Sequence, residues 1–259
     1  MGRMGYTWRQ AAQLAPQLAG DDAFDFVGVW THLVMADDTA QDAFTRCQLD
    51  AFDLLLADLE RQGCRPPIAH AANSAGLVRF PQSHYDMVRA GIGVYGHMPS
   101  VEGRARAAEA GLVLEPAMQL AAPVTFVKQV PAGTPISYGA TWTATRPTWM
   151  VTVRAGYADG YPRALSNKGR LVVGGRPASV AGRVCMDQMV LALDEPEDGP
   201  PAIGDEAILF GSGAEGDTPA ADVLGAACGT HVYDLLVRVS ARVPRAYHDF
   251  KSDDAQPVL

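Results

Sequence analysis

The chain has 259 residues, enough for one large domain or two ordinary ones. With 48% hydrophobic and 19% charged residues it falls in the globular range, which excludes a disordered tail, a coiled coil and a collagen. Its formal charge of −8 argues against nucleic acid and anionic lipid as partners, and the sequence, without a long apolar run or a signal peptide, indicates a cytoplasmic protein with no membrane segment.

The first part of the chain alternates predicted helices and strands. Residues 7–20 and 38–63 have the 3.6-residue apolar period of helices that pack on one face. Residues 24–30, 66–72 and 87–96 are short, nearly continuous apolar runs, as expected of buried parallel strands. This order predicts an α/β fold with about three units of a TIM-type (β/α) barrel, which is only part of the eight-unit barrel.

From about residue 115 the sequence changes to short β-rich runs separated by glycine and proline. A single helix is predicted among them, at 219–229. The predicted β runs are residues 124–130, 136–144, 148–162, 170–175, 178–193, 206–211 and 232–244. We therefore expect residues 1–114 to be the C-terminal part of a barrel and residues 115–259 to be a mainly β domain.

Polar side chains gather where the predicted strands end. His32 follows the first strand, Ser74 follows the second, and Arg89 lies inside the third. In a β/α barrel the carboxyl ends of the strands build the active site, so this placement favours a barrel over a doubly wound sheet.

Each of these three residues has an ordinary structural alternative. Ser74 opens a short predicted helix, where its hydroxyl and the free N–H groups would suit a phosphate, but it would equally suit a helix N-cap. Arg89 would need an acidic partner if it were only structural, because a buried charge must be paired. His32 taken by itself would be a packed core histidine. The cysteines have no metal-site spacing, so we expect no bound metal.

Seven short strings contain residue types that are unusual for packing alone. They are MGRMG (1–5), WTHL (30–33), HAANSAG (70–76), VRAGIGVYG (88–96), ISYGATW (136–142), GYADGYPR (156–163) and GRVCMDQ (182–188). Together they resemble the alanine racemases, pyridoxal-phosphate enzymes built from a β/α barrel and a β domain, and the resemblance runs from Met1 to about Tyr247. It implies interconversion of L-alanine and D-alanine for peptidoglycan, in a homodimer with shared active sites. A racemase for serine or for a broader set of amino acids is an alternative of the same class.

The resemblance implies how the cofactor, pyridoxal phosphate, is bound. Four residues would hold its phosphate: Ser74, Gly91 (backbone), Ile92 (backbone) and Tyr233. Arg89 would donate to the pyridine nitrogen, with His32 hydrogen-bonded behind it. Because a guanidinium has a pKa above about 12, it would leave the ring nitrogen unprotonated, which makes a weaker electron sink and suits a racemase.

The resemblance also implies the residues that act on the substrate. Tyr138 would remove or deliver the α-proton on the L face, reaching the active site of the other subunit; on sequence alone it would be a half-buried packing tyrosine. A phenol has an ordinary pKa near 10 and needs nearby positive charge or hydrogen bonds to act as a base at neutral pH. Arg3 and the main chain of Met186 would lie near the substrate carboxylate, and Tyr157 would line the substrate entrance.

The sequence departs from the family at the second base, the lysine that carries the cofactor. Residues 1–127 contain no lysine, and Lys128, Lys168 and Lys251 match no such motif. Met1 aligns inside the family's D-T-G-M-G-R string, so we expect it to be an internal methionine of a longer product, with a truncated gene as the alternative. We expect the chain by itself to lack racemase activity. From another class, the alternative is a non-catalytic racemase-like subunit that offers Tyr138 to a lysine-bearing chain.

Overall fold

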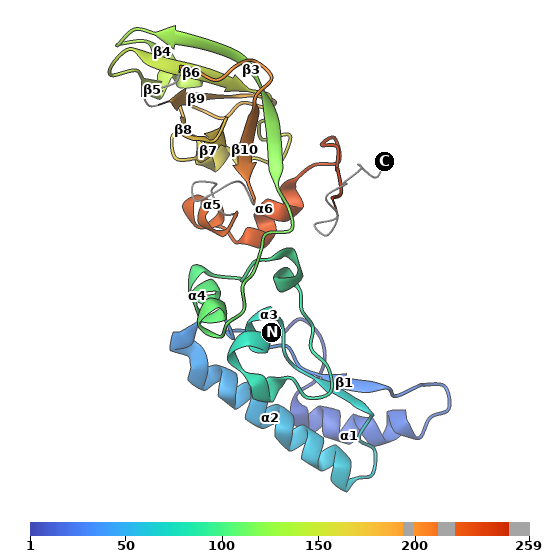
Figure 1. Cartoon of the computed structure of the whole chain (residues 1–259). Coiled ribbons are helices and arrows are strands. Elements are labelled where there is room, and N and C mark those ends of the chain that lie inside the picture. Colours follow the sequence, from blue (N-terminus) through green and yellow to red (C-terminus); the bar gives the residue numbers. More distant parts are fainter. Residues whose placement is uncertain (194–198, 212–220, 249–259) are drawn as a thin grey trace. The chain divides into compact units, whose positions relative to one another are not determined.

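A computed structural model describes residues 1–193, 199–211 and 221–248. The chain divides into two compact units, Met1–Ala117 and Met118–Leu259, each with its own secondary structure (Figure 1). No helix within the described ranges is both long and apolar enough to cross a membrane.

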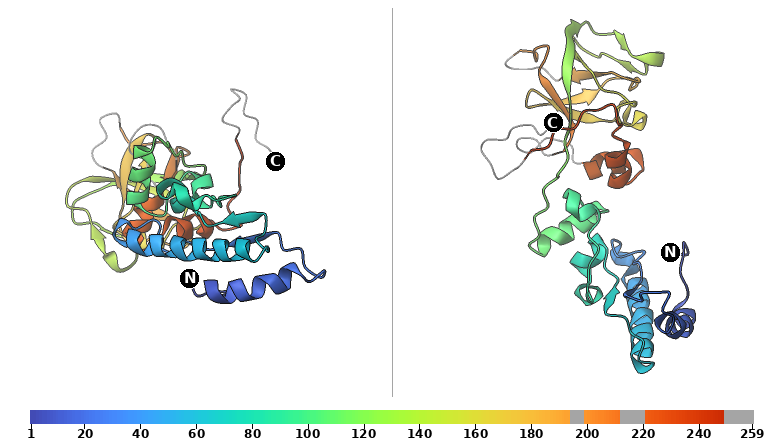
Figure 2. Two further views of the ribbon diagram at one scale, coloured as in Figure 1. Left: turned by 90° about the horizontal axis from the view of Figure 1, so that it is seen from below. Right: turned by 90° about the vertical axis from the view of Figure 1, so that its right-hand side faces the viewer.

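The first unit contains helices and a two-stranded parallel sheet. Helices α1 (Trp8–Ala19) and α2 (Asp42–Arg61) lie side by side (Figure 2), and both confirm the helices predicted from apolar period. Strands β1 (Gly28–Trp30) and β2 (Ile68–His70) pair in parallel, as expected. The shorter elements are α3 (Ser74–Arg79), α4 (Val101–Glu109), η1 (Thr39–Gln41), η2 (Pro81–Ser83) and η3 (Ile92–Tyr95).

The core of the first unit is built mainly on one face of α2. Its fully or almost fully buried side chains recur at the helical spacing: Leu49, Phe52, Leu55, Leu56 and Leu59. Leu33 and Phe80 pack into the same cluster from the segments that follow β1 and α3. The core therefore joins α2 to the segments that carry the polar residues at the strand ends.

The third strand predicted in this unit, at residues 87–96, was wrong. Met87 makes one isolated parallel bridge to His70, and the chain then turns into η3. Gly91 has φ −104° and ψ −99°, outside the range of a strand, and Gly96 ends η3 in the left-handed region at φ 73°. A Cβ at Gly96 would lie 1.7 Å from the carbonyl oxygen of Glu115. The two paired strands do not establish a TIM-type barrel, which stays a prediction.

The second unit is a closed six-stranded barrel with the strand order β10-β3-β6-β9-β8-β7. The strands are β3 (Leu120–Val130), β6 (Thr148–Val153), β7 (Arg170–Val173), β8 (Arg176–Val180), β9 (Met189–Leu193) and β10 (Glu206–Phe210). Every neighbouring pair is antiparallel. In β9 the buried Met189, Leu191 and Leu193 alternate with half-buried residues, as one face of a barrel strand requires. The mainly β architecture expected here is confirmed.

One predicted β run is interrupted by a short 3₁₀ helix, and another begins with an α-helix. Residues 136–144 lie in a hairpin of β4 (Pro135–Ile136) and β5 (Trp142–Thr143), which η4 (Tyr138–Ala140) separates. Residues 232–244 begin with helix α6 (Val232–Arg238) in place of a strand.

Helix α6 forms because its apolar residues share one helical face. Val232, Leu235 and Leu236 are buried, and Asp234 in the first turn binds Arg238 at 2.8 Å one turn later. The helix predicted at 219–229 is confirmed as α5 (Ala221–Cys228), although residues 219–220 lie outside the described ranges.

Candidate active site

Arg89 is the centre of a polar cluster at the ends of β1 and β2. Its Nη2 donates to the carbonyl oxygens of Thr31 at 2.9 Å and Ala71 at 3.1 Å. The same Nη2 lies 3.4 Å from Nδ1 of His32, and its Nη1 is hydrogen-bonded to Nδ1 of His70. Among the described residues, carbonyls and imidazoles surround this cation in place of the carboxylate that a structural salt bridge would need.

His70 belongs to this cluster, although the sequence reasoning assigned it no role. It is the last residue of β2 and is the register partner of Trp30. Their rings stack with centroids 6.1 Å apart and planes 4° apart, and the Arg89 guanidinium lies 5.1 Å from the Trp30 ring centroid. The signal that identifies His70 is its position at a strand end, which is the same signal that indicated His32.

Both imidazoles of the cluster are poised to be neutral. Burial lowers the pKa of His32 below its ordinary value, and the positive charges of Arg89 and Arg3 lower it further. Burial and the charge of Arg89 lower the pKa of His70 in the same way. A neutral imidazole can accept a hydrogen bond at Nδ1, so each ring can hold the guanidinium without competing for its proton.

Arg89 keeps donors that this cluster does not use. A guanidinium has five N–H groups, and in the described part of the chain neither its Nε–H nor its second Nη1–H has a partner. Arg3 is exposed and lies close by, where residues 1–6 line a cavity of about 340 Å³ with Trp30, Thr31, His32 and Gln48. Trp30, Thr31 and His32 contact Arg89 and also line the cavity, so the cavity borders the cluster.

Ser74 joins the loop after Arg89 to the start of α3. Ser74 is 4% exposed, and its hydroxyl oxygen accepts from the N–H groups of Gly91 at 2.9 Å and Gly93 at 3.1 Å. The N-cap of α3 is Asn73, whose side chain accepts from Gly76, so the N-cap alternative for Ser74 was wrong. No described residue accepts the Ser74 hydroxyl proton, which leaves it available to an anion.

Tyr138 lies on a strained turn in the second unit. Ser137 has φ 62° and ψ −179°, a region that only glycine adopts easily, and Gly139 and Ala140 also have positive φ. The Ser137 hydroxyl donates to the carbonyl of Arg183 at 2.7 Å and holds the turn in place. The Tyr138 side chain is 73% exposed within its unit, so the half-buried packing alternative was wrong.

The segments of Tyr157 and Met186 are joined by their backbones in the same unit. The N–H of Tyr157 donates to the carbonyl of Cys185 at 3.0 Å, and that of Ala158 donates to the carbonyl of Met186 at 2.8 Å. Gly156 permits this approach, since a Cβ there would lie 2.3 Å from the Cys185 oxygen. The Met186 N–H has no partner among the described residues, so it can donate to a ligand.

Three segments of the second unit, 137–139, 156–158 and 183–186, therefore lie together. The remaining candidate of that unit, Tyr233, is 44% exposed on α6. Because Ser74, Gly91 and Ile92 belong to the first unit, the grouping of Tyr233 with them stays a prediction. Lys128 and Lys168 also belong to the second unit, and Lys251 lies outside the described residues.

Comparisons with known proteins give the same family along the chain. The family model described as "Alanine racemase, N-terminal domain" matches residues 1–99, and "Alanine racemase, C-terminal domain" matches residues 117–247. The alanine racemase of Carboxydothermus hydrogenoformans is 41% identical over 248 residues, covering 95% of this chain and 65% of the relative. That of Symbiobacterium thermophilum is 42% identical over 247 residues, covering 95% and 63%.

Solved structures of alanine racemases are also similar. The enzyme of Streptomyces coelicolor A3(2) has a TM-score of 0.83 at 38% identity, covering 95% of this chain and 62% of that chain. The enzyme of Clostridium difficile 630, solved in complex with cycloserine, has a TM-score of 0.83 at 34% identity, covering 96% and 62%. This chain thus spans less than two thirds of the length of these relatives.

Proposed function

We propose that this chain, which belongs to the alanine racemase family, takes part in the pyridoxal-phosphate-dependent interconversion of L-alanine and D-alanine. The Arg89 cluster is the observation that carries the proposal. Neutral imidazoles and carbonyls bind the Arg89 guanidinium, and some of its N–H donors remain unused. The Ser74 hydroxyl is hydrogen-bonded to the loop that directly follows Arg89. We further propose that residues 1–114 form the C-terminal part of a TIM-type barrel and that residues 115–259 form the β domain.

We infer that the cofactor's phosphate is held by Ser74, by the backbone of Gly91 and Ile92, and by Tyr233. The unused hydroxyl proton of Ser74 fits a phosphate oxygen, and the unused N–H groups of Arg89 fit the pyridine nitrogen. When bound, pyridoxal phosphate supplies an electron sink for negative charge at the α-carbon of an amino acid.

Arg89 is the residue that would donate to the ring nitrogen of the bound cofactor. Its guanidinium keeps its proton at any physiological pH, so it would donate a hydrogen bond without protonating that nitrogen, which would suit a racemase. His32 and His70 contact its Nη atoms, and the guanidinium carbon lies 5.1 Å from the ring centroid of Trp30.

We infer that Tyr138 transfers the α-proton on the L face of a substrate bound by the partner subunit. Its exposure and the strained turn that presents it support this role. Arg3 and the Met186 N–H would donate to the substrate carboxylate, because both carry N–H donors with no partner in the described residues. Tyr157, joined to the Met186 segment through its backbone, would line the entrance.

The proposal includes a cytoplasmic homodimer that supplies D-alanine to peptidoglycan. A racemase acting on serine or on several amino acids is the alternative within the class, and rates on alanine, serine and lysine decide between them. A non-catalytic subunit is the second alternative, because residues 1–127 contain no lysine to act as the other base.

Complementation by mixed dimers tests the role of Tyr138, which the non-catalytic alternative shares. The Streptomyces coelicolor racemase with phenylalanine in place of its own catalytic tyrosine keeps its lysine and is mixed with this chain. We expect the wild-type chain to restore racemisation and the Tyr138→Phe chain, which should fold equally well because this side chain is exposed, to restore none.

The chain by itself is assayed in parallel, and we expect no racemisation from it. Racemisation by the chain alone would overturn the expected inactivity. Equal results from the wild type and Tyr138→Phe, each shown to form mixed dimers, would overturn the role of Tyr138.

A further inference from the structure

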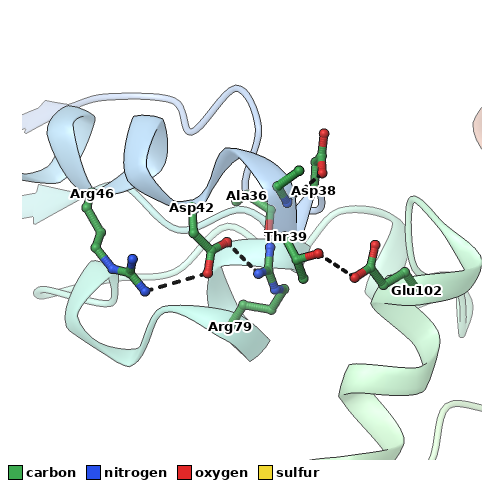
Figure 3. Close-up of polar contacts among 8 residues, drawn as sticks. Ala36, Asp38, Thr39, Asp42, Arg46, Arg79 and Glu102 are labelled. Carbon is green, nitrogen blue, oxygen red and sulfur yellow. Dashed lines mark hydrogen bonds and ion pairs between the residues drawn. The ribbon is translucent and has the colours of Figure 1, made fainter.

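A partly buried ion pair in the first unit, between Arg79 and Asp42, lies outside the residues assigned so far. Arg79 is the last residue of α3, and its side chain is 8% exposed. Its Nη1 donates to the carbonyl oxygen of Ala36 at 2.6 Å, and its Nη2 donates to Oδ1 of Asp42 at 2.5 Å (Figure 3). Asp42 is the first residue of α2. Arg79 thus joins the end of α3 to the beginning of α2 and to the chain before it.

Helix α3 is held at both ends by the segment of residues 33–42. At its N-terminus the Asn73 side-chain amide donates to the carbonyl of Leu33 at 3.1 Å. At its C-terminus Arg79 binds Ala36 and Asp42. A helix of six residues is too short to be stable alone, so its position depends on such contacts.

The segment that holds α3 begins directly after the residues that hold Arg89. Thr31 and His32, which contact the Arg89 guanidinium, immediately precede Leu33. Residues 31–42 therefore link α3 to Arg89, in addition to two direct links: the Arg89 N–H donates to the carbonyl of Ala72 at 2.9 Å, and the Ser74 hydroxyl accepts from Gly91 and Gly93. A second contact anchors this stretch, because Thr39 donates to Glu102 of α4 at 2.6 Å (Figure 3).

We propose that Arg79 is a positioning residue: by binding Ala36 and Asp42 it holds α3, and with it Ser74, in place relative to Arg89, and so favours pyridine ligands that carry a phosphate over those that do not. The inference rests on the proposed function, because Ser74 is the phosphate group's partner there. Arg79 itself touches neither Ser74 nor Arg89, so its effect passes through α3 and the 31–42 stretch.

The chain offers a matched control for the test. Arg46 also approaches Asp42, at 3.6 Å, but its side chain is 61% exposed and it does not contact Ala36 (Figure 3). Arg46→Met and Arg79→Met therefore remove the same kind of charge from the same carboxylate, and only the second releases α3. Arg79→Lys keeps the charge without the two-pronged donor geometry.

The first readout needs no ligand. Gly91 and Gly93 donate their N–H groups to the Ser74 hydroxyl, so their amide hydrogen exchange, followed by NMR, reports whether Ser74 is in place. In Arg79→Met we expect these two amides to exchange about tenfold faster or more, because loss of the contacts that hold α3 makes local opening easier. We expect a smaller effect in Arg79→Lys and none in Arg46→Met.

The second readout is binding of pyridoxamine 5′-phosphate and of pyridoxamine by equilibrium dialysis. These probes lack the aldehyde that would react with Lys128 and Lys168. We expect Arg79→Met to raise the Kd of the phosphorylated probe about tenfold and to leave the Kd of pyridoxamine unchanged. Arg46→Met should change neither Kd.

Unchanged exchange at Gly91 and Gly93 in Arg79→Met would overturn the inference, as would an equal loss of both probes or the same effect in Arg46→Met. If Arg79→Met does not fold, Asp42→Asn and Arg79→Lys are compared with Arg46→Met by the same two measurements. If the wild-type chain binds neither probe, both the proposed cofactor site and the proposed ligand preference are wrong. The exchange rates of Gly91 and Gly93 still decide whether Arg79 positions Ser74.

Discussion

Nη1 of Arg89 is hydrogen-bonded to Nδ1 of His70, a residue 19 positions earlier in the chain. The contact requires His70 to be unprotonated at Nδ1, and burial together with the charge of Arg89 lowers the pKa of His70 to favour that state. His32 has its pKa lowered by burial and by the same cation. The two histidines can therefore accept hydrogen bonds from Arg89 at Nδ1 only while their rings are neutral.

The first prediction is that the first unit becomes less stable as the pH falls below about 6.5, the ordinary histidine pKa. Both histidines have a lower pKa in the folded chain than in the unfolded chain, so in this range the unfolded state binds more protons and acid favours it. Both rings are partly exposed, so the effect should be modest. Thermal unfolding between pH 7.5 and 5 measures it. The variant with glutamine at both positions should show a flatter dependence, and an identical slope for both proteins would contradict the prediction.

Ser74→Ala should destabilise the first unit by about 1–3 kcal/mol, because two N–H groups, of Gly91 and Gly93, lose their acceptor. Ser100→Ala is the control, since that hydroxyl accepts from a single N–H, of Gly103, at the start of α4, a loss worth about 1 kcal/mol. Urea unfolding followed by circular dichroism gives both values. A smaller cost for Ser74→Ala than for Ser100→Ala would show that the Ser74 hydroxyl does not hold this loop.

Gly156→Ala should destabilise the second unit by about 2–3 kcal/mol, because the new Cβ would lie 2.3 Å from the Cys185 oxygen and 2.5 Å from the Met186 oxygen. These are backbone atoms of a packed segment and cannot move independently. Gly133→Ala, with positive φ but no atom within 4 Å of the new Cβ, should cost about 1 kcal/mol. Equilibrium unfolding measures the stability of both variants. A larger loss of stability in Gly133→Ala than in Gly156→Ala would contradict the close approach.

Ser137 separates backbone strain from hydrogen bonding in the Tyr138 turn. Ser137→Ala keeps φ at 62° and loses the bond to Arg183, whereas Ser137→Gly loses the same bond but relieves the strain. We expect the glycine variant to be more stable than the alanine variant by about 1–3 kcal/mol. Differential scanning calorimetry of the two proteins measures this difference, and equal midpoints would indicate that the turn relaxes without strain.

Much of the secondary structure could be predicted from the sequence because its signals are local. The apolar period of residues 38–63 predicted helix α2, and short β-rich runs separated by glycine and proline predicted barrel strands such as β9. Residues 87–96 misled this reasoning because an apolar run does not reveal that Gly96 lies against Glu115. Residues 232–244 were predicted as a β run, but burial of Val232, Leu235 and Leu236 on one face decided for helix α6.

For the site, the sequence by itself determined the family and the candidate residues, because residues that belong to one loop are adjacent in the sequence and form recognisable short strings. Only the tertiary structure decided the partners of those residues. The cation of Arg89 is held by His70 and His32, and α3 is held by Arg79, through contacts between segments 19, 57 and 37 residues apart. The physical reason is that a local pattern encodes which face of an element is apolar, whereas a half-buried charge takes its partner from whichever segment the folded chain brings within hydrogen-bond distance.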